Sequence, residues 1–297
     1  MAISFVPRSA QRGFTLIELV MVIILMGIIG GMVAVFMKSP IDAYFDSARR
    51  AGLTDVADTV VRRMARDIQR ALPNSLGTSS DGQCLEFIPT KTGGRYREQE
   101  IVNGDNTSLN FAVADDRFNM LGDNNGATVP ADQKIGNGDV VVIYNLGIPG
   151  ADAYQGDNTA VVSGVPTVSG SPPETSIVLA PVKQFPLQSS AKRFQVVPAS
   201  EQVVAYVCSA GRLYRLARSV LGTASPGSPA HICPASGSAT VAAADPIIAA
   251  NVNCGLSRFN YSGSDLQRNA LVSMTLALTD KGETITLQHE VHVSNVP

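Results

Sequence analysis

The sequence has few of the residues that catalysis and nucleic-acid binding require. It contains three histidines and no G-x-S-x-G, G-x-x-x-x-G-K-[ST] or H-E-x-x-H pattern, which mark common hydrolase, nucleotide-binding and metalloprotease sites. No lysine-rich run occurs, and 25 acidic residues outnumber 23 basic ones, so the charge does not support a nucleic-acid surface. We therefore expect neither an enzyme nor a nucleic-acid-binding protein.

Candidate metal ligands are sparse as well. His289 and His292 lie in a predicted strand, where side chains three positions apart face opposite ways, so we expect His289 alone on the covered face. Residues 123–126 match part of a calcium loop but lack its terminal glutamate, and an ordinary polar turn is expected there. His231 lies in a loop rich in Pro, Ser and Gly with no evident partner. We expect no metal and no other cofactor.

Cysteine is limited to four residues, Cys84, Cys208, Cys233 and Cys254, and no two of them form a C-x-x-C pair. All four follow the apolar segment described next. An even number of cysteines in an oxidising compartment favours two disulfides, and three pairings are open. If one bridge is local, Cys208–Cys233 or Cys233–Cys254 closes the smaller loop.

A long apolar run near the N-terminus is the most informative feature of the sequence. From Leu19 to Met37 it spans 19 residues without a polar side chain. As a helix it measures roughly 28 Å, enough to cross a membrane. Arg8 and Arg12 precede it without an acid, so the N-terminal side is expected in the cytoplasm and the remaining chain across the membrane. A cleaved secretory signal fits poorly, because the run is too long and no A-x-A site follows.

One carboxylate, Glu18, lies at the start of this apolar segment. An ionised carboxylate in hydrocarbon costs on the order of 2.5 kcal/mol or more, so Glu18 needs a partner and is a candidate functional residue. The alternative is a plain signal anchor in which Glu18 lies near the lipid headgroups.

The residues Gly13-Phe14-Thr15-Leu16-Ile17-Glu18 resemble the processing motif of type IV prepilins, which pilins and type II secretion pseudopilins share. In that family a prepilin peptidase cuts after the glycine, the new N-terminus is methylated, and the glutamate serves assembly. The resemblance implies cleavage between Gly13 and Phe14 and N-methylation of Phe14. It also implies that the Phe14 amine pairs with Glu18 of a neighbouring subunit, which would remove two isolated buried charges at once.

Three further blocks resemble large minor pilins of the W or J type: residues 53–75, 84–97 and 292–297. The blocks 84–97 and 292–297 resemble more specifically the minor pilins of the mannose-sensitive haemagglutinin (MSHA) pilus. The resemblance implies a single-pass inner-membrane protein with a periplasmic C-terminal domain, which then enters the pilus or its tip complex and serves biogenesis and adhesion. Its partners would be prepilin peptidase, the assembly machinery, and other minor and major pilins. The alternatives are a J-type type II secretion pseudopilin and a membrane-anchored periplasmic binding protein or enzyme.

The expected fold is α+β, with one long N-terminal helix packed on an antiparallel sheet. We divide the chain into a leader (1–13), a transmembrane helix (14–38), an amphipathic helix (39–75) and a β-rich head (76–297). Pro40 is expected to kink or interrupt the helix. From 42 to 72, an apolar stripe at helical spacing opposes a charged face with an Asp58–Arg62 pair. The stripe comprises Phe45, Ala48, Val56, Val60, Met64, Ile68 and Leu72.

Beyond the helix, short β-rich runs alternate with clusters of turn residues. Ala210-Gly211 and residues 280–282 are predicted hairpin turns, and residues 115–138 and 149–173 are predicted long loops. The predicted strands are 84–88, 109–113, 139–145, 176–179, 193–197, 203–208, 212–216, 257–261, 271–279 and 283–293.

Overall fold

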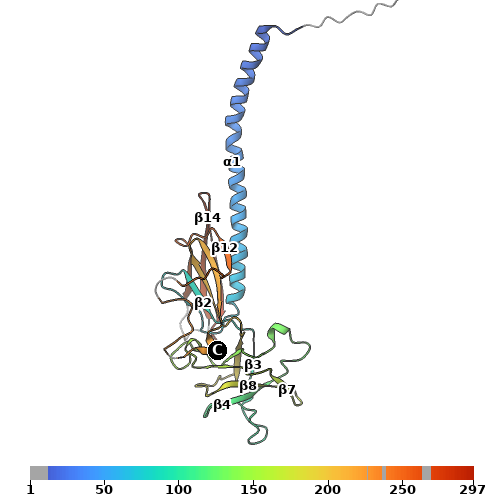
Figure 1. Ribbon diagram of the computed structural model, residues 1–297, viewed down its shortest axis with the longest axis vertical. Coiled ribbons are helices and arrows are strands. Elements are labelled where there is room, and N and C mark those ends of the chain that lie inside the picture. The colour runs from blue at the N-terminus through green and yellow to red at the C-terminus, as the bar shows by residue number, and fades with distance from the viewer. Residues whose placement is uncertain (1–12, 226, 236–238, 263–268) are drawn as a thin grey trace, which may run out of the picture. The chain divides into compact units, whose positions relative to one another are not determined.

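A computed structural model describes residues 13–225, 227–235, 239–262 and 269–297 (Figure 1). Most of the predicted leader, with Arg8 and Arg12, lies outside the described residues. The chain forms two compact units, residues 1–52 and 53–297, which are considered separately. The architecture is α+β, as predicted: one long N-terminal helix followed by antiparallel sheets.

The helix α1 runs without interruption from Leu16 to Ile68, 53 residues. It continues through Pro40, so the prediction of an interruption there was wrong. Proline removes one backbone hydrogen bond, and the intact bonds on both sides of it preserve the helix. The helix ends four residues before the predicted Leu72, whose N–H instead donates to the Ile88 carbonyl at 2.7 Å.

The end of α1 packs on two antiparallel sheets, and this contact forms the main core of residues 53–297. The first sheet has the order β1-β2-β10-β11-β12 and the second the order β13-β14-β15. Their bounds are β1 Gly77–Thr78, β2 Cys84–Phe87, β10 Val203–Ser209, β11 Arg212–Arg218, β12 Ile247–Ala250, β13 Arg258–Ser262, β14 Asn269–Asp280 and β15 Glu283–Ser294.

The predicted apolar stripe is confirmed only in the last part of α1. Val60, Met64 and Ile68 are buried against the sheets, whereas Phe45 and Val56 are exposed. Within residues 53–297, Leu53 is partly buried against this core and Ala57 is the first fully buried residue of α1. On the exposed face, Arg62 Nε donates to Asp58 Oδ2 at 2.7 Å, the predicted pair.

Figure 1 shows a second group of strands, among them β3, β4, β7 and β8. These strands have an apolar core of their own. One sheet has the order β3-β9-β5-β6 and the other the order β4-β8-β7. Their bounds are β3 Thr92–Arg95, β4 Asp115–Leu121, β5 Val140–Val142, β6 Thr159–Val161, β7 Thr167–Ser169, β8 Glu174–Lys183 and β9 Arg193–Val197. Short 3₁₀ turns occur at η1 Ala131–Gln133, η2 Ala153–Gln155 and η3 Leu221–Thr223.

Several segments differ from the predicted strand pattern, among them the short strands β1, β3 and β12, which were not predicted. The segment 109–113 is irregular, because the Asn110 side chain accepts the Ala112 N–H at 2.8 Å and competes with strand pairing. The predicted loop 115–138 contains β4, and the predicted loop 149–173 contains β6 and β7. β4 opens with three charged residues of low or weak β propensity, and β6 and β7 have only 3 residues each, so sequence periodicity could not identify them.

Both predicted hairpin turns are confirmed. Ala210-Gly211 joins β10 to β11, and Lys281-Gly282 joins β14 to β15. All four residues have positive φ, between 48° and 86°, as a two-residue type I′ turn requires. The second turn fixes the register of the longest hairpin, in which Asp280 faces Glu283.

Candidate functional site

The predicted processing site lies directly before the start of α1. Gly13 and Phe14 are exposed and outside the helix. Thr15 caps it, because its Oγ1 accepts the Glu18 N–H at 3.3 Å and its carbonyl accepts the Glu18 and Leu19 N–H groups at 3.1 Å. Thr15 and Glu18 have the spacing of a helix-capping box. The helix therefore leaves the Gly13–Phe14 peptide bond free in an irregular segment that a protease can reach.

Glu18 lies in the first turn of α1, where a carboxylate is favoured by the positive end of the helix dipole. Its side chain is exposed in the isolated chain. The cap at Thr15 fixes Glu18 one turn after Phe14, so the carboxylate and the predicted new N-terminus lie at the same end of the helix. The structure thus brings together the three residues that the sequence singled out.

The following turns of α1 expose a continuous apolar surface. Large apolar side chains are exposed from Phe14 to Phe45, among them Phe36 at 77%. By length and composition α1 can cross a membrane, and it is the one helix within the described ranges that can. Soluble monomers rarely expose so large an apolar area, so lipid or other helices must cover it.

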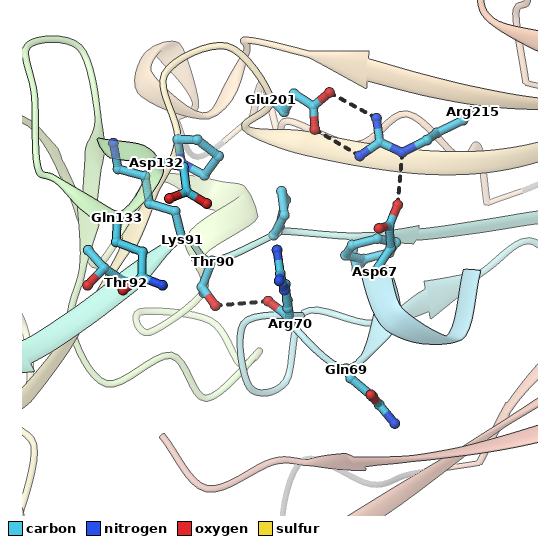
Figure 2. A pocket seen from close by; sticks show the side chains of 13 residues that line it. Asp67, Gln69, Arg70, Thr90, Lys91, Thr92, Asp132, Gln133, Glu201 and Arg215 are labelled. Carbon is cyan, nitrogen blue, oxygen red and sulfur yellow. Dashed lines mark hydrogen bonds and ion pairs between the residues drawn. The ribbon is translucent and has the colours of Figure 1, made fainter. Parts of the chain in front are cut away.

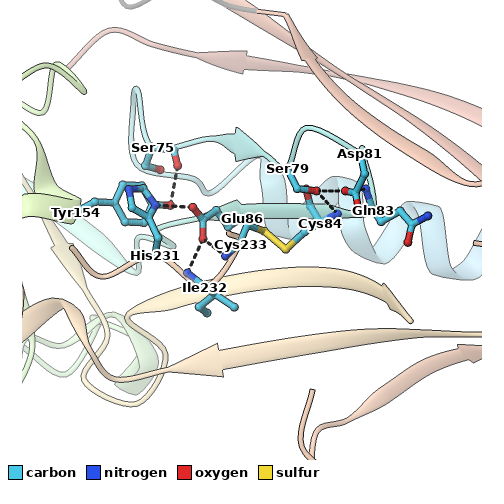
Figure 3. Close-up of a disulfide and its surroundings, with 10 residues drawn as sticks. All are labelled: Ser75, Ser79, Asp81, Gln83, Cys84, Glu86, Tyr154, His231, Ile232 and Cys233. Carbon is cyan, nitrogen blue, oxygen red and sulfur yellow. Dashed lines mark hydrogen bonds and ion pairs between the residues drawn. A yellow bond between two sulfur atoms is a disulfide. The ribbon is translucent and has the colours of Figure 1, made fainter. Parts of the chain in front are cut away.

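The four cysteines form two disulfides, as predicted, but neither predicted local pairing is correct. Cys84 is bonded to Cys233 (Figure 3), and Cys208 is bonded to Cys254. Cys84 and Cys208 lie on neighbouring strands but on opposite faces of the sheet, since Cys84 pairs with Val207, the residue before Cys208. Cys208 belongs to the core under α1 and Cys84 to a cluster on the other face. The two disulfides therefore lie on opposite faces of the same sheet.

His231 has a partner that the sequence did not reveal (Figure 3). Its Nδ1 lies 2.6 Å from Oε1 of Glu86, which is 3% exposed. The other Glu86 oxygen accepts the N–H groups of Ile232 and Cys233, each at 2.7 Å. The His231 ring stacks on Tyr154 with centroids 4.2 Å apart. The hydrogen bond to Glu86 raises the pKa of His231, against the opposing effect of burial. The sequence feature that could have indicated this site is Glu86, a single acidic residue within the otherwise apolar strand β2.

A second polar cluster lines a pocket of about 470 Å³ at the end of α1 (Figure 2). Arg215 donates to Asp67 at 2.9 Å and to both Glu201 oxygens at 2.8 and 2.9 Å, and the Tyr206 hydroxyl donates to Asp67 at 2.6 Å. An acid near a helix C-terminus opposes the dipole, so Arg215 compensates for Asp67. The hydrogen bonds from Arg215 lower the pKa of Glu201. The bonded side chains hold the helix end to the sheet and form no nucleophile–base pair.

The candidate metal ligands remain apart. Asp123 Oδ1 accepts the Asn125 N–H at 2.7 Å, so residues 123–126 form a turn through their own side chains. His289 faces the covered side of β15 and His292 the exposed side, as predicted. Within residues 13–225, 227–235, 239–262 and 269–297, no group of three or more His, Cys, Asp or Glu could hold a metal ion.

The comparison with protein families matches the N-terminal segment. Residues 8–34 match the model of the prokaryotic N-terminal methylation motif. No curated protein and no solved structure matches the chain. The matched segment contains Gly13, Phe14 and Glu18, whose arrangement at the start of α1 is described above. The chain thus carries the N-terminal segment of a type IV pilin-like or pseudopilin-like protein, which implies processing by prepilin peptidase, membrane anchoring through α1 and assembly with other pilins.

Proposed function

We propose that the protein is a minor type IV pilin, most similar to those of the MSHA pilus. The leader 1–13 is removed, Phe14 is methylated, and the subunit enters the pilus or its initiation and tip complex, where it serves biogenesis and adhesion. The observation that carries this proposal is the capped start of α1, with an exposed cleavage site, Glu18 in the first turn and a long apolar surface behind it.

Processing needs a glycine because the peptidase must reach the backbone at the cut. Apart from its two chain neighbours, Gly13 has no atom within 4 Å of the position that a Cβ would occupy. This fold would therefore accept a larger residue at position 13, and the requirement for glycine comes from the peptidase. The proposed site is therefore a substrate site, and we assign the chain no catalytic residue of its own.

Assembly follows from the cost of buried charge. In the single subunit, Glu18 and the Phe14 amine are both exposed, and water or headgroups satisfy them. In a packed bundle of α1 helices water is excluded, so the amine of one subunit and Glu18 of another must pair. Removing one partner of a buried pair costs about 3–5 kcal/mol.

The disulfides of the head favour its location outside the cytoplasm. Two disulfides persist in oxidising compartments, which fits a single-pass inner-membrane protein with its head in the periplasm and later on the cell surface. The J-type type II secretion pseudopilin is the second candidate, because the same N-terminal motif serves both systems. The blocks 84–97 and 292–297 favour the pilus.

The test is mass spectrometry of the N-terminus from sheared, purified pili. We expect the mature protein to begin at Phe14, to carry one added methyl group and to be present in the filament fraction. An unprocessed N-terminus would refute the pilin proposal. A processed subunit that is absent from pili but present in secretion-system pseudopili would favour the second candidate.

A further inference from the structure

The sheet β13-β14-β15 ends in an exceptionally long edge strand. β15 has 12 residues and pairs with β14 along its whole length without a bulge. The strands at the other edges of the four sheets have between 2 and 7 residues. Proteins normally keep exposed edges short, because unpaired N–H and C=O groups recruit further strands.

The type I′ turn at Lys281-Gly282 decides which backbone groups face outward. Such a turn makes Asp280 and Glu283 a hydrogen-bonded pair, and bonded positions then alternate along the hairpin. The bonds of Ala277 and Thr279 to Asn253 and Asn251, on the far side of β14, agree with this phase. The outward groups belong to Thr284, Thr286, Gln288, Glu290, His292 and Ser294. Within the described part of the chain, no backbone or side-chain group bonds to the outward N–H and C=O groups of these six residues.

The edge also lacks the usual protection against pairing. β15 contains no proline, lysine or arginine, and its outward-facing positions are mainly neutral polar residues, including two threonines. Among these six positions, the titratable side chains are Glu290 and His292. The strand is thus regular, accessible and chemically suited to accept a neighbour.

The core beneath the sheet is incompletely covered at this edge. Met274 and Leu276 of β14 are buried, whereas Ile285 and Leu287 of β15 are only partly buried although they pack against the same core. These two side chains are at the margin because the sheet ends with β15. An added strand with apolar residues at alternate positions would extend the core over them.

We propose that β15 is a strand-addition site, where an extended segment of a neighbouring pilin-like subunit pairs with the outer edge. The identity of the partner rests on the proposed function. The segment has no proline, places apolar side chains beside Ile285 and Leu287, and carries a cation across from Glu290. A second copy of β15 fits less well, because it adds two further glutamates and no lysine or arginine.

The test is photo-crosslinking in cells that assemble the pilus. A benzophenone amino acid replaces Thr286 or His292 in the edge strand β15. The control is the same replacement at Asn260 of β13, which is exposed on the same face of the sheet but lies at its opposite edge. We expect adducts from both edge positions, mapped by mass spectrometry to an extended segment of another subunit with a prepilin motif. We expect no such adduct from Asn260.

Two substitutions at one position test the backbone pairing itself. The N–H of Gln288 faces outward, so Gln288→Pro removes a donor from the edge without removing a bond to β14. We expect Gln288→Pro to lower the His292 adduct about tenfold, the equivalent of about 1.4 kcal/mol, and Gln288→Ala to leave it within about twofold. If thermal unfolding shows that the proline variant does not fold, Thr286→Lys blocks the edge without changing the backbone.

The outcomes separate the two proposals. Strand addition is wrong if the edge positions give no adduct, or give adducts only with a second copy of this chain. It is also wrong if Asn260 gives the same adducts as the edge positions, or if Gln288→Pro and Thr286→Lys leave the His292 adduct unchanged. The N-terminus of the same protein is analysed in parallel. A methylated Phe14 without edge adducts overturns strand addition and leaves the pilin proposal intact, whereas an uncleaved N-terminus overturns the pilin proposal.

Discussion

Glu86→Ala should destabilise the head more than any other change to a single polar side chain of the Figure 3 site. Glu86 is 3% exposed and accepts the Ile232 and Cys233 N–H groups, each at 2.7 Å, as well as the contact from His231 at 2.6 Å. Alanine would leave the N–H of the buried Cys233 and the N–H of the partly buried Ile232 without an acceptor. Each such donor costs about 1–3 kcal/mol, so we expect a total loss of about 3–5 kcal/mol.

Two control variants separate the roles of charge and geometry. Glu86→Gln keeps an acceptor oxygen for the loop N–H groups, so its cost should be about 1–2 kcal/mol. His231→Ala removes a half-exposed ring and should cost about 1 kcal/mol or less, after allowance for solvent screening. The double variant Glu86→Ala with His231→Ala should cost less than the sum of the single variants, because their contact is counted twice in that sum.

The assay is denaturant unfolding of the full chain in detergent micelles with both disulfides intact, followed by circular dichroism of the β-rich head. The free energy of unfolding of each variant is compared with that of the unchanged protein at neutral pH. A loss below about 0.5 kcal/mol for Glu86→Ala would refute the reasoning, since that is the range of ordinary surface substitutions.

Four further outcomes are expected. Gly13→Val should leave an uncleaved membrane species, visible as a heavier band and an intact N-terminus; normal maturation would contradict the processing site. Glu18→Ala should still be cleaved but should not co-purify with sheared filaments, whereas Glu18→Gln should be partly incorporated because its amide oxygen still accepts a hydrogen bond; full incorporation of Glu18→Ala would remove its assembly role. Replacing Cys84 and Cys233 together by alanine should cost about 5 kcal/mol, from the entropy of closing a loop of sequence separation 149, and an unchanged unfolding midpoint would exclude this. The pKa of His231 is raised in the folded state, so its stabilising contribution is complete below about pH 6.5 and is lost as pH rises through the folded pKa. The stability difference from His231→Ala should therefore shrink as pH rises above about 6.5, and a growing difference would contradict this.

The sequence by itself determined the features that depend on neighbouring residues. The apolar run and its capping box are local, so α1 and the position of Glu18 were predictable. β9 has the predicted bounds, and the Lys281-Gly282 turn is indicated by Gly282, since glycine readily adopts positive φ. The even number of cysteines on one side of the membrane segment was enough to predict two disulfides.

Only the tertiary structure decided which distant groups meet. Cys84 pairs with Cys233 because strand register places it on the face of the sheet opposite Cys208, and a shift of one residue would exchange the faces. Glu86 meets His231 across 145 residues, a separation at which no local pattern carries information. The open edge of β15 likewise exists only because no other described strand pairs there. Contacts of this kind depend on how whole sheets are placed, and short-range sequence patterns do not specify that placement.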